Sequence, residues 1–185
     1  MSKIWMTSDL HLCHDRDFVW KPRGFNSVHE MNDAIVKNWN KVVDVNDDVY
    51  VLGDLMLNDN ATALRLIKQL KGAIHIVRGN HDSEGRMVLY DDCYNVIEMT
   101  EGQFLKYNGY HFYLSHYPCI TDNYDVDKPL KKRMINLCGH THCDNRFQDA
   151  NKGLIYHVEL DAHNIYPVEI NTIIEDIKNY ITLYS

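Results

Sequence analysis

The chain has 185 residues, of which 45% are hydrophobic, and its formal net charge is −7 at pH 7. This length and composition predict one domain, spanning residues 1–185, with a core of its own. The negative charge argues against a protein that holds extended nucleic acid on a basic surface, because such binding depends on neutralising phosphates with lysine and arginine.

The amino terminus and the cysteines predict a cytoplasmic protein. Met1-Ser2-Lys3 leads directly into Ile4-Trp5-Met6, with no basic region, long apolar segment or small-residue cleavage site. We therefore expect neither export nor a membrane span. The five cysteines include no Cys-x-x-Cys pair, which argues against a disulfide framework and against a structural zinc knot.

The first half of the chain is predicted to alternate between strands and helices. Apolar runs predict strands at 3–8, 48–52 and 73–77, and apolar residues spaced by three or four predict helices near 28–43 and 60–71. We expect the first of these helices to start at a Ser-x-x-Glu capping box, the second to be capped by Asn60, and 15–26 to be a loop. This order favours parallel strands with right-handed crossovers, whose carboxyl ends share one edge of a sheet.

Polar groups follow each of these three strands. The first strand ends in Asp9-Leu10-His11, the second in Gly53-Asp54 and the third in Gly79-Asn80-His81-Asp82. Residues at i and i+2 of an extended segment point to the same side, so Asp9 and His11 can converge on one metal ion. His14 could line the same cleft or face solvent.

The second half is predicted to consist mainly of strands. Asn108-Gly109 is a two-residue hairpin signal, the strand after it delivers His116, and a later strand stops at Gly139-His140-Thr141-His142. The expected elements are strands at 94–99, 103–107, 110–115, 133–138 and 156–160, helices near 84–90 and 171–180, and a hairpin around Asn151-Lys152-Gly153.

These strand-end motifs, in this order, resemble the calcineurin-like metallophosphoesterase superfamily over nearly the whole chain. The likeness is greatest to its small stand-alone bacterial and phage members, and it includes Pro22-Arg23-Gly24-Phe25 and Asn164-Ile165-Tyr166-Pro167. The resemblance implies an α/β fold, a four-layer αββα sandwich of two mixed β-sheets flanked by helices.

The resemblance also implies a centre of two divalent metal ions. In that family the first metal is held by residues that match Asp9, His11, Asp54 and His142, and the second by residues that match Asp54, Asn80, His116 and His140. Oxygen and imidazole ligands without thiolate suit Mn²⁺, Fe, Zn²⁺ or Ni²⁺, and we expect Mn²⁺ first.

The implied activity is hydrolysis of a small phosphodiester or phosphomonoester, with nucleotides among the candidates, by in-line attack of a hydroxide that bridges the metals. By analogy His81 is the proton donor to the leaving group. Some family members orient this histidine with a carboxylate at the position of Leu57, so Asp82 is the candidate substitute; otherwise His81 binds phosphate oxygens. Arg23 and Arg78 are candidate phosphate clamps.

Two other functions stay open, a nuclease for short or single-stranded ends and a catalytically silent scaffold. The protein is expected to be a monomer or a homodimer. Substrate specificity is expected to lie in the loops 15–26 and 121–132. Four aromatic residues could stack a nucleobase or could instead pack the loops against the sheet, namely Trp20, Phe25, Tyr117 and Tyr124.

Overall fold

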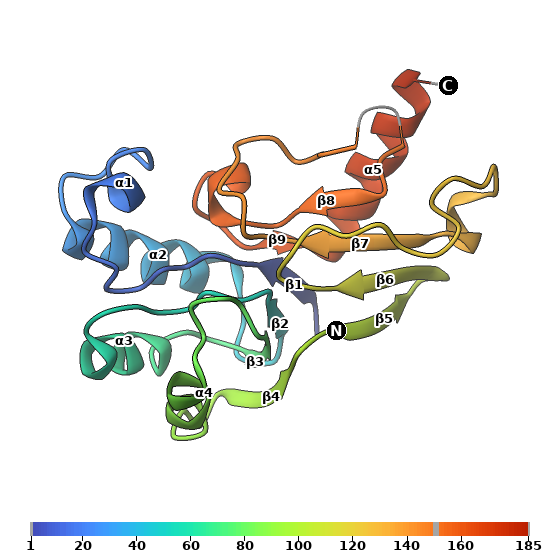
Figure 1. The fold of residues 1–185 in the computed structure, drawn as a ribbon. Helices are drawn as coiled ribbons and strands as arrows, with labels where there is room; N and C mark the ends of the chain where they lie inside the picture. The colour runs from blue at the N-terminus through green and yellow to red at the C-terminus, as the bar shows by residue number, and fades with distance from the viewer. Residues whose placement is uncertain (1, 150–151, 185) are drawn as a thin grey trace.

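The computed structural model describes residues 2–149 and 152–184, and its strands form two mixed sheets flanked by helices (Figure 1). The first sheet has the order β4-β3-β2-β1-β9 and the second the order β5-β6-β7-β8. The strands are β1 Ile4–Thr7, β2 Asp48–Val51, β3 Ala73–Val77, β4 Val96–Thr100, β5 Gln103–Tyr107, β6 Tyr110–Leu114, β7 Met134–Cys138, β8 Ile155–His157 and β9 Val168–Glu169. The helices are α1 Asp17–Trp20, α2 Val28–Val42, α3 Asn60–Ile67, α4 Glu84–Tyr90 and α5 Ile170–Tyr184, with short 3-10 helices at Leu130–Lys132 and Leu160–His163.

Strand direction explains where the polar motifs gather. β1, β2, β3 and β4 pair in parallel, and only β9 runs antiparallel to its neighbour β1. In the second sheet β5 and β6 form the predicted hairpin, while β6, β7 and β8 are parallel. The predicted parallel order is therefore confirmed, and the strands' carboxyl ends lie at common sheet edges.

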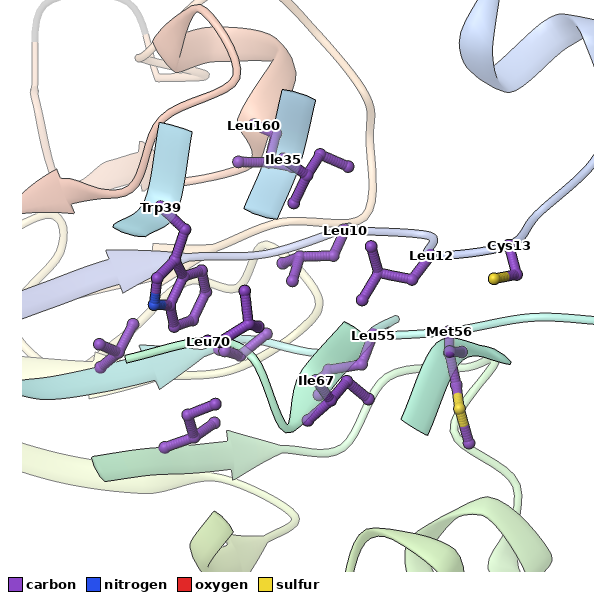
Figure 2. Packing of buried hydrophobic residues seen from close by; sticks show 14 of the residues in the cluster. Leu10, Leu12, Cys13, Ile35, Trp39, Leu55, Met56, Ile67, Leu70 and Leu160 are labelled. Atoms are coloured by element: carbon purple, nitrogen blue, oxygen red, sulfur yellow. The ribbon is translucent and has the colours of Figure 1, made fainter. Parts of the chain in front are cut away.

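Two apolar clusters hold the layers together. On one face of the first sheet Trp5, Val49 and Ile74 share a cluster with residues of α2 and α3. Figure 2 shows Trp39 of α2 and Ile67 of α3 in this cluster. The alternate residues of the same strands point the other way because side chains alternate across a strand. They join the second sheet and α5 in a separate cluster that includes Met6, Tyr50, Phe112, Leu137 and Ile173.

The caps of α2 and α3 follow from local hydrogen bonding. Ser27 accepts a hydrogen bond from the Glu30 amide at 3.1 Å and starts α2 as predicted. The cap of α3 is Asp59, which accepts from the Thr62 amide at 3.0 Å, so the prediction of Asn60 as the cap is wrong by one residue. Both side chains satisfy amides that have no partner within the helix.

Three further predictions need correction. The expected loop 15–26 contains the one-turn helix α1, which inserts Val19 and Trp20 into the core. The strand expected at 94–99 begins only at Val96; just before it, the Asn95 side chain donates hydrogen bonds to the carbonyl groups of Ile67, the last residue of α3, and Leu70. The strand expected at 156–160 ends at His157, and Leu160–His163 is a 3-10 helix.

The turn after β5 matches its sequence signal. Asn108 and Gly109 both have positive φ, 49° and 80°, as the favoured two-residue hairpin turn requires. For the hairpin expected around Asn151-Lys152-Gly153, Asn151 lies outside the described residues. Within 2–149 and 152–184, none of the helices combines the length and apolarity needed to span a bilayer.

Candidate metal centre

The seven predicted metal ligands converge at the carboxyl ends of the strands. Asp9 and His11 follow β1, Asp54 follows β2 and Asn80 follows β3. The second sheet supplies the rest, His116 after β6 and the pair His140 and His142 after β7. Residues from two sheets, separated by up to 133 positions in the chain, therefore face one another.

A first group of ligand atoms surrounds one point. The Nε2 atoms of His11 and His142 lie 3.0 Å apart. Asp9 Oδ1 lies 3.7 Å from the former and 3.5 Å from the latter. Asp54 Oδ2 is 3.8 Å from His11 Nε2. These four residues are the set expected for a first metal.

A second group lies on the other side of the same aspartate. His116 Nε2 is 2.8 Å from Asn80 Oδ1 and 3.2 Å from His140 Nδ1. Asp54 Oδ2 is 3.6 Å from His116 Nε2. A single oxygen of Asp54 thus adjoins both groups, which is the position that a bridging ligand would occupy.

The chemistry of the donor atoms fits cations. Asp9 Oδ1 is buried and has no hydrogen-bond partner among the described residues. A buried carboxylate oxygen without a partner is costly unless a positive charge satisfies it. The imidazole nitrogens crowd around this oxygen and around Asp54, and nitrogen and oxygen donors of this kind are ligands of first-row divalent metals.

The outward-facing nitrogens of two ligands have defined partners. His116 Nδ1 lies 2.8 Å from the Leu52 carbonyl oxygen, which can only accept, so Nδ1 carries the proton and Nε2 presents its lone pair to the centre. Likewise, His142 Nδ1 lies 3.2 Å from the Asp161 Oδ2 acceptor, so its Nδ1 donates the hydrogen bond and its Nε2 faces the centre. Carboxylate and carbonyl partners of this type fix the orientation of metal-binding histidines.

The backbone at the ligands is strained. Asp9, His11, Asp54, His140 and His142 have φ values of 55°, 49°, 57°, 76° and 52°. This left-handed region is uncommon for residues other than glycine, and strain of this kind clusters at functional sites. Five of the seven predicted ligands therefore adopt a conformation that the surrounding fold must enforce.

Two glycines allow the ligand loops to approach one another closely. A Cβ atom on Gly79 would lie 2.2 Å from Asp54 Oδ1, and one on Gly139 would lie 2.3 Å from Asp9 Oδ2. Neither glycine has a positive φ, so the requirement is for space. Gly79 and Gly139 are thus needed where a predicted ligand from another strand passes close to the main chain.

The carboxylates and imidazoles modify one another's protonation. Burial by itself raises the pKa of Asp9, but the adjacent His11 and His142 rings bring that pKa down to about 2. Burial lowers the pKa of His11. Burial also opposes the charged form of His142, yet the hydrogen bond to Asp161 and the charge of Asp9 raise its pKa. The ionised Asp9 carboxylate beside the neutral His11 imidazole is the state that binds a metal, whereas His142 would have to release its proton on binding.

Asp82 has a different role from the one expected. Its carboxylate is fully buried and accepts hydrogen bonds from the amides of Asp54 at 2.7 Å, Gly79 at 2.9 Å and Leu55 at 3.3 Å, and from the Tyr90 hydroxyl at 2.7 Å. None of the hydrogen bonds described for Asp82 comes from the His81 ring. The interpretation that Asp82 orients His81 is therefore corrected: Asp82 positions the main chain at Asp54 and Gly79.

His81 and His14 lie beside the ligand groups. The His81 side chain is 39% exposed, and its Nε2 is 3.9 Å from Asp54 Oδ2. His14 is buried and does not face solvent, and its Nδ1 is 3.2 Å from His11 Nδ1. Burial, reinforced by the neighbouring His11 and His81, lowers the pKa of His14 to about 4. His14 thus contacts the ring of a predicted ligand as a neutral imidazole.

The two arginines expected to clamp phosphate are engaged with the protein. The Arg23 side chain is 1% exposed, bonds to the Asp161 carboxylate at 2.7 and 2.9 Å, and donates to the Asp9 carbonyl oxygen at 2.7 Å. Arg78 donates to the Asp82 carbonyl oxygen at 2.8 Å and pairs with Glu84 and Glu101. In this conformation both arginines brace ligand loops, and Arg23 has no donor directed to open solvent.

Sequence reasoning missed Asp161, which joins Arg23 to His142. Its carboxyl pKa is held far below the usual range, because the His142 and Arg23 contacts outweigh the effect of burial. Arg23 and Asp161 are 138 positions apart, and no local pattern marks either as a partner of the other. The nearby sequence signals are the apolar run at 156–160 and the Asn164-Ile165-Tyr166-Pro167 stretch, and neither includes Asp161.

A further cluster, Cys143, His157 and Glu159, lies beneath the loop that carries His140 and His142. The Thr141 hydroxyl sits among these groups, 2.8 Å from Glu159 Oε1 and 3.3 Å from both His157 Nδ1 and Cys143 Sγ. The cluster therefore acts as a hydrogen-bonded anchor for Thr141, which lies between the predicted ligands His140 and His142.

Comparison with known proteins agrees with this geometry. The model of the calcineurin-like phosphoesterase superfamily domain matches residues 3–158. The chain is 34% identical over 183 residues to the uncharacterized protein MJ1445 of Methanocaldococcus jannaschii, a match that covers 96% of this chain and 93% of that protein. It is 28% identical over 206 residues to the Gene 66 protein of Mycobacterium phage D29, covering 96% and 98%.

Among solved structures, a protein of unknown function from Aquifex aeolicus, AQ665, has the same fold. It superimposes with a TM-score of 0.72 at 22% identity, over 95% of this chain and 99% of that one. A structure described as a novel archaeal phosphodiesterase has a TM-score of 0.50 at 16% identity, over 84% and 82% of the two chains. At these identities the structural likeness concerns the fold alone.

Proposed function

The chain belongs to the calcineurin-like phosphoesterase superfamily, and from this premise we propose that it is a metal-dependent phosphoric ester hydrolase with two divalent cations. The observation that carries the proposal is that Asp54 adjoins both groups of predicted ligands: its Oδ2 lies 3.8 Å from His11 Nε2 and 3.6 Å from His116 Nε2. The retention of all seven ligand positions weighs against a silent scaffold.

The first cation would be held by Asp9, His11, Asp54 and His142, and the second by Asp54, Asn80, His116 and His140. When bound, such a pair activates water as a nucleophile and neutralises charge on the phosphate oxygens. The nitrogen and oxygen donor set suits Mn²⁺, Fe, Zn²⁺ and Ni²⁺ alike, and Mn²⁺ is the ion that we propose.

The chain's own residues supply positioning and a proton. The His81 amide donates to Asp54 Oδ1 at 2.8 Å, which fixes the histidine next to the shared carboxylate. Its half-exposed ring can reach a substrate and donate a proton from Nε2 to the leaving oxygen, a contribution of typically 10²–10⁴-fold. Asp82 and Arg78 hold the loop from which this ring projects.

The substrate is a small phosphodiester or phosphomonoester, and the protein acts in the cytoplasm as a monomer or homodimer. The free state of all five cysteines supports a reducing compartment.

Two esters and one variant test this function. Protein stripped of metal and reconstituted with Mn²⁺ should hydrolyse bis-p-nitrophenyl phosphate or p-nitrophenyl phosphate, and the stripped protein should not. His81→Ala should lower kcat by about 10²–10⁴-fold for an ester with an alkoxide leaving group, with unchanged metal content. The loss should be far smaller for the p-nitrophenyl esters, because p-nitrophenolate leaves without a proton. Equal losses of kcat and metal content would make His81 a ligand and contradict its role as proton donor.

A further inference from the structure

Of the four aromatic residues that the sequence offered as stacking platforms, three pack into the protein. Trp20 is buried in the first core and Phe25 packs against it. Tyr124 packs against the second core, with the Lys152 ammonium 4.1 Å from its ring centroid. Tyr117 remains 51% exposed. Of these four rings, only that of Tyr117 is therefore exposed enough to stack on a ligand.

Tyr117 lies against two predicted ligands. Its ring centroid is 4.7 Å from that of His140 and 5.1 Å from that of His116. Its carbonyl oxygen accepts a hydrogen bond from the Ser115 hydroxyl at 2.8 Å, which fixes the main chain just beyond His116. An exposed aromatic ring is therefore held in place at the second group of ligands, without a role in the core.

A second exposed ring adjoins the other ligand group. Helix α1 directs Val19 and Trp20 into the core and leaves Phe18 73% exposed. The Phe18 ring centroid lies 5.7 Å from that of His14, and the His14 centroid lies 5.9 Å from that of His81. Phe18 is therefore on the side of the residue expected to protonate the leaving group.

The ring contacts around the predicted metal centre fall into two separate sets. One contains Phe18, His14, His11, His81 and His142, and the other contains Tyr117, His116 and His140. No ring contact described in 2–149 and 152–184 joins the two sets. The two exposed aromatic residues therefore mark two ends of the centre.

Resting on the proposed hydrolase activity, we propose that the substrate is a phosphoester that carries a flat ring, such as a nucleobase, and that Tyr117 and Phe18 determine this specificity. The retained group stacks on Tyr117 and the leaving group packs against Phe18. Aromatic side chains bind any base through its π-face, so this contact selects ring-bearing esters without selecting one base.

Two diesters with the same leaving group and the same charge test the assignment. Thymidine 5′-(p-nitrophenyl phosphate) and ethyl p-nitrophenyl phosphate differ only in the retained group. Tyr117→Ala should lower kcat/KM for the thymidine ester by about 5- to 150-fold, the range expected for loss of one base–aromatic stack, and leave the ethyl ester within twofold. Tyr117→Phe should behave like the native protein.

Phe18→Ala should lower kcat/KM for both diesters alike, because both release p-nitrophenol. Phe104→Ala is the matched control, because Phe104 lies on β5, is 74% exposed and lines an apolar pocket that contains no predicted metal ligand. This variant should change neither rate. Metal content should be the same in all four variants.

Equal kcat/KM for the two diesters in the native protein, or equal losses in Tyr117→Ala, would overturn the assignment of Tyr117. Unchanged rates in Phe18→Ala would overturn that of Phe18. If the loaded protein hydrolyses no ester, the proposed function fails, and calorimetry with thymidine 5′-monophosphate and ethyl phosphate still decides the ring proposal. Tighter binding of the nucleotide that is lost in Tyr117→Ala would support it, and equal affinities would overturn it.

Discussion

Gly79→Ala is expected to damage both the fold and the metal centre through a single methyl group. The added Cβ would lie 2.2 Å from Asp54 Oδ1 and 2.6 Å from the Asp54 amide nitrogen, where ordinary contact begins at 3.4 Å. Gly79 does not have a positive φ, so the effect comes from collision and not from the backbone angle. Neither Gly79 nor Asp54 can move away easily, because the Asp82 carboxylate accepts hydrogen bonds from the backbone amides of both residues.

The size of the effect follows from these contacts. Overpacking of a tight site destabilises a protein by about 1–3 kcal/mol. Replacing glycine also restricts the unfolded chain, which offsets about 0.4–1 kcal/mol of this destabilisation. The net destabilisation is roughly 1–2 kcal/mol, or a fall in Tm of about 2–8 °C for a chain of this length. Displacement of Asp54 should also weaken the affinity for Mn²⁺ by at least about tenfold, since a misplaced ligand loses around 1.4 kcal/mol or more.

Gly85→Ala is the matched control. Gly85 lies in α4, and a Cβ there would meet nothing within 4 Å. Alanine in a helix is favoured over glycine by about 0.5–1 kcal/mol, so this variant should raise Tm by roughly 1–4 °C. Thermal unfolding and Mn²⁺ calorimetry on both variants give the comparison. A Gly79→Ala protein with native Tm and native metal affinity would refute the account of this close approach.

Two further predictions concern carboxylates. Asp161→Asn should weaken Mn²⁺ binding about 10- to 100-fold, because the charged partner of His142 is lost. Asp176→Asn is the control: it also removes the carboxylate partner of an arginine, but it lies on α5, so Mn²⁺ affinity should be unchanged. Equal losses of Mn²⁺ affinity in the two variants would argue against a role for Asp161. Burial raises the pKa of Asp47, but hydrogen bonds from backbone amides and from Trp5 Nε1 lower it overall. The ionised carboxylate therefore stabilises the fold above its unfolded pKa of about 3.9, and this stability is lost as pH falls through the lower folded pKa. Urea unfolding should show Asp47→Asn less stable by about 1–3 kcal/mol at pH 7, with the gap closing below pH 4; a gap independent of pH would contradict this reasoning.

The strand-end motifs were predictable from sequence because each is local. Asp9 and His11, or His140 and His142, stand two residues apart after an apolar run, and parallel pairing then places the motifs at one edge of a sheet. The order of the motifs along the chain was enough to assign the family.

The supporting contacts were not predictable because they join distant parts of the chain. The sequence around Arg23 is typical of an exposed loop, yet the Arg23 side chain is buried against Asp161, which lies beyond β8. Asp82 adjoins His81 in sequence, but its carboxylate turns inward to Tyr90 and to the amides beyond β2. The exposure of Phe18 likewise depends on which residues of α1 enter the core.

The measurement that tests the central claim most directly is the number of Mn²⁺ ions bound per chain, determined by calorimetry together with elemental analysis, in the native protein and in Asp54→Asn. The shared position of Asp54 predicts two ions in the native protein, with weakened binding at both sites and loss of ester hydrolysis in the variant. At most one ion in the native protein, or a variant that loses one ion and binds the other with native affinity, would contradict a centre bridged by Asp54.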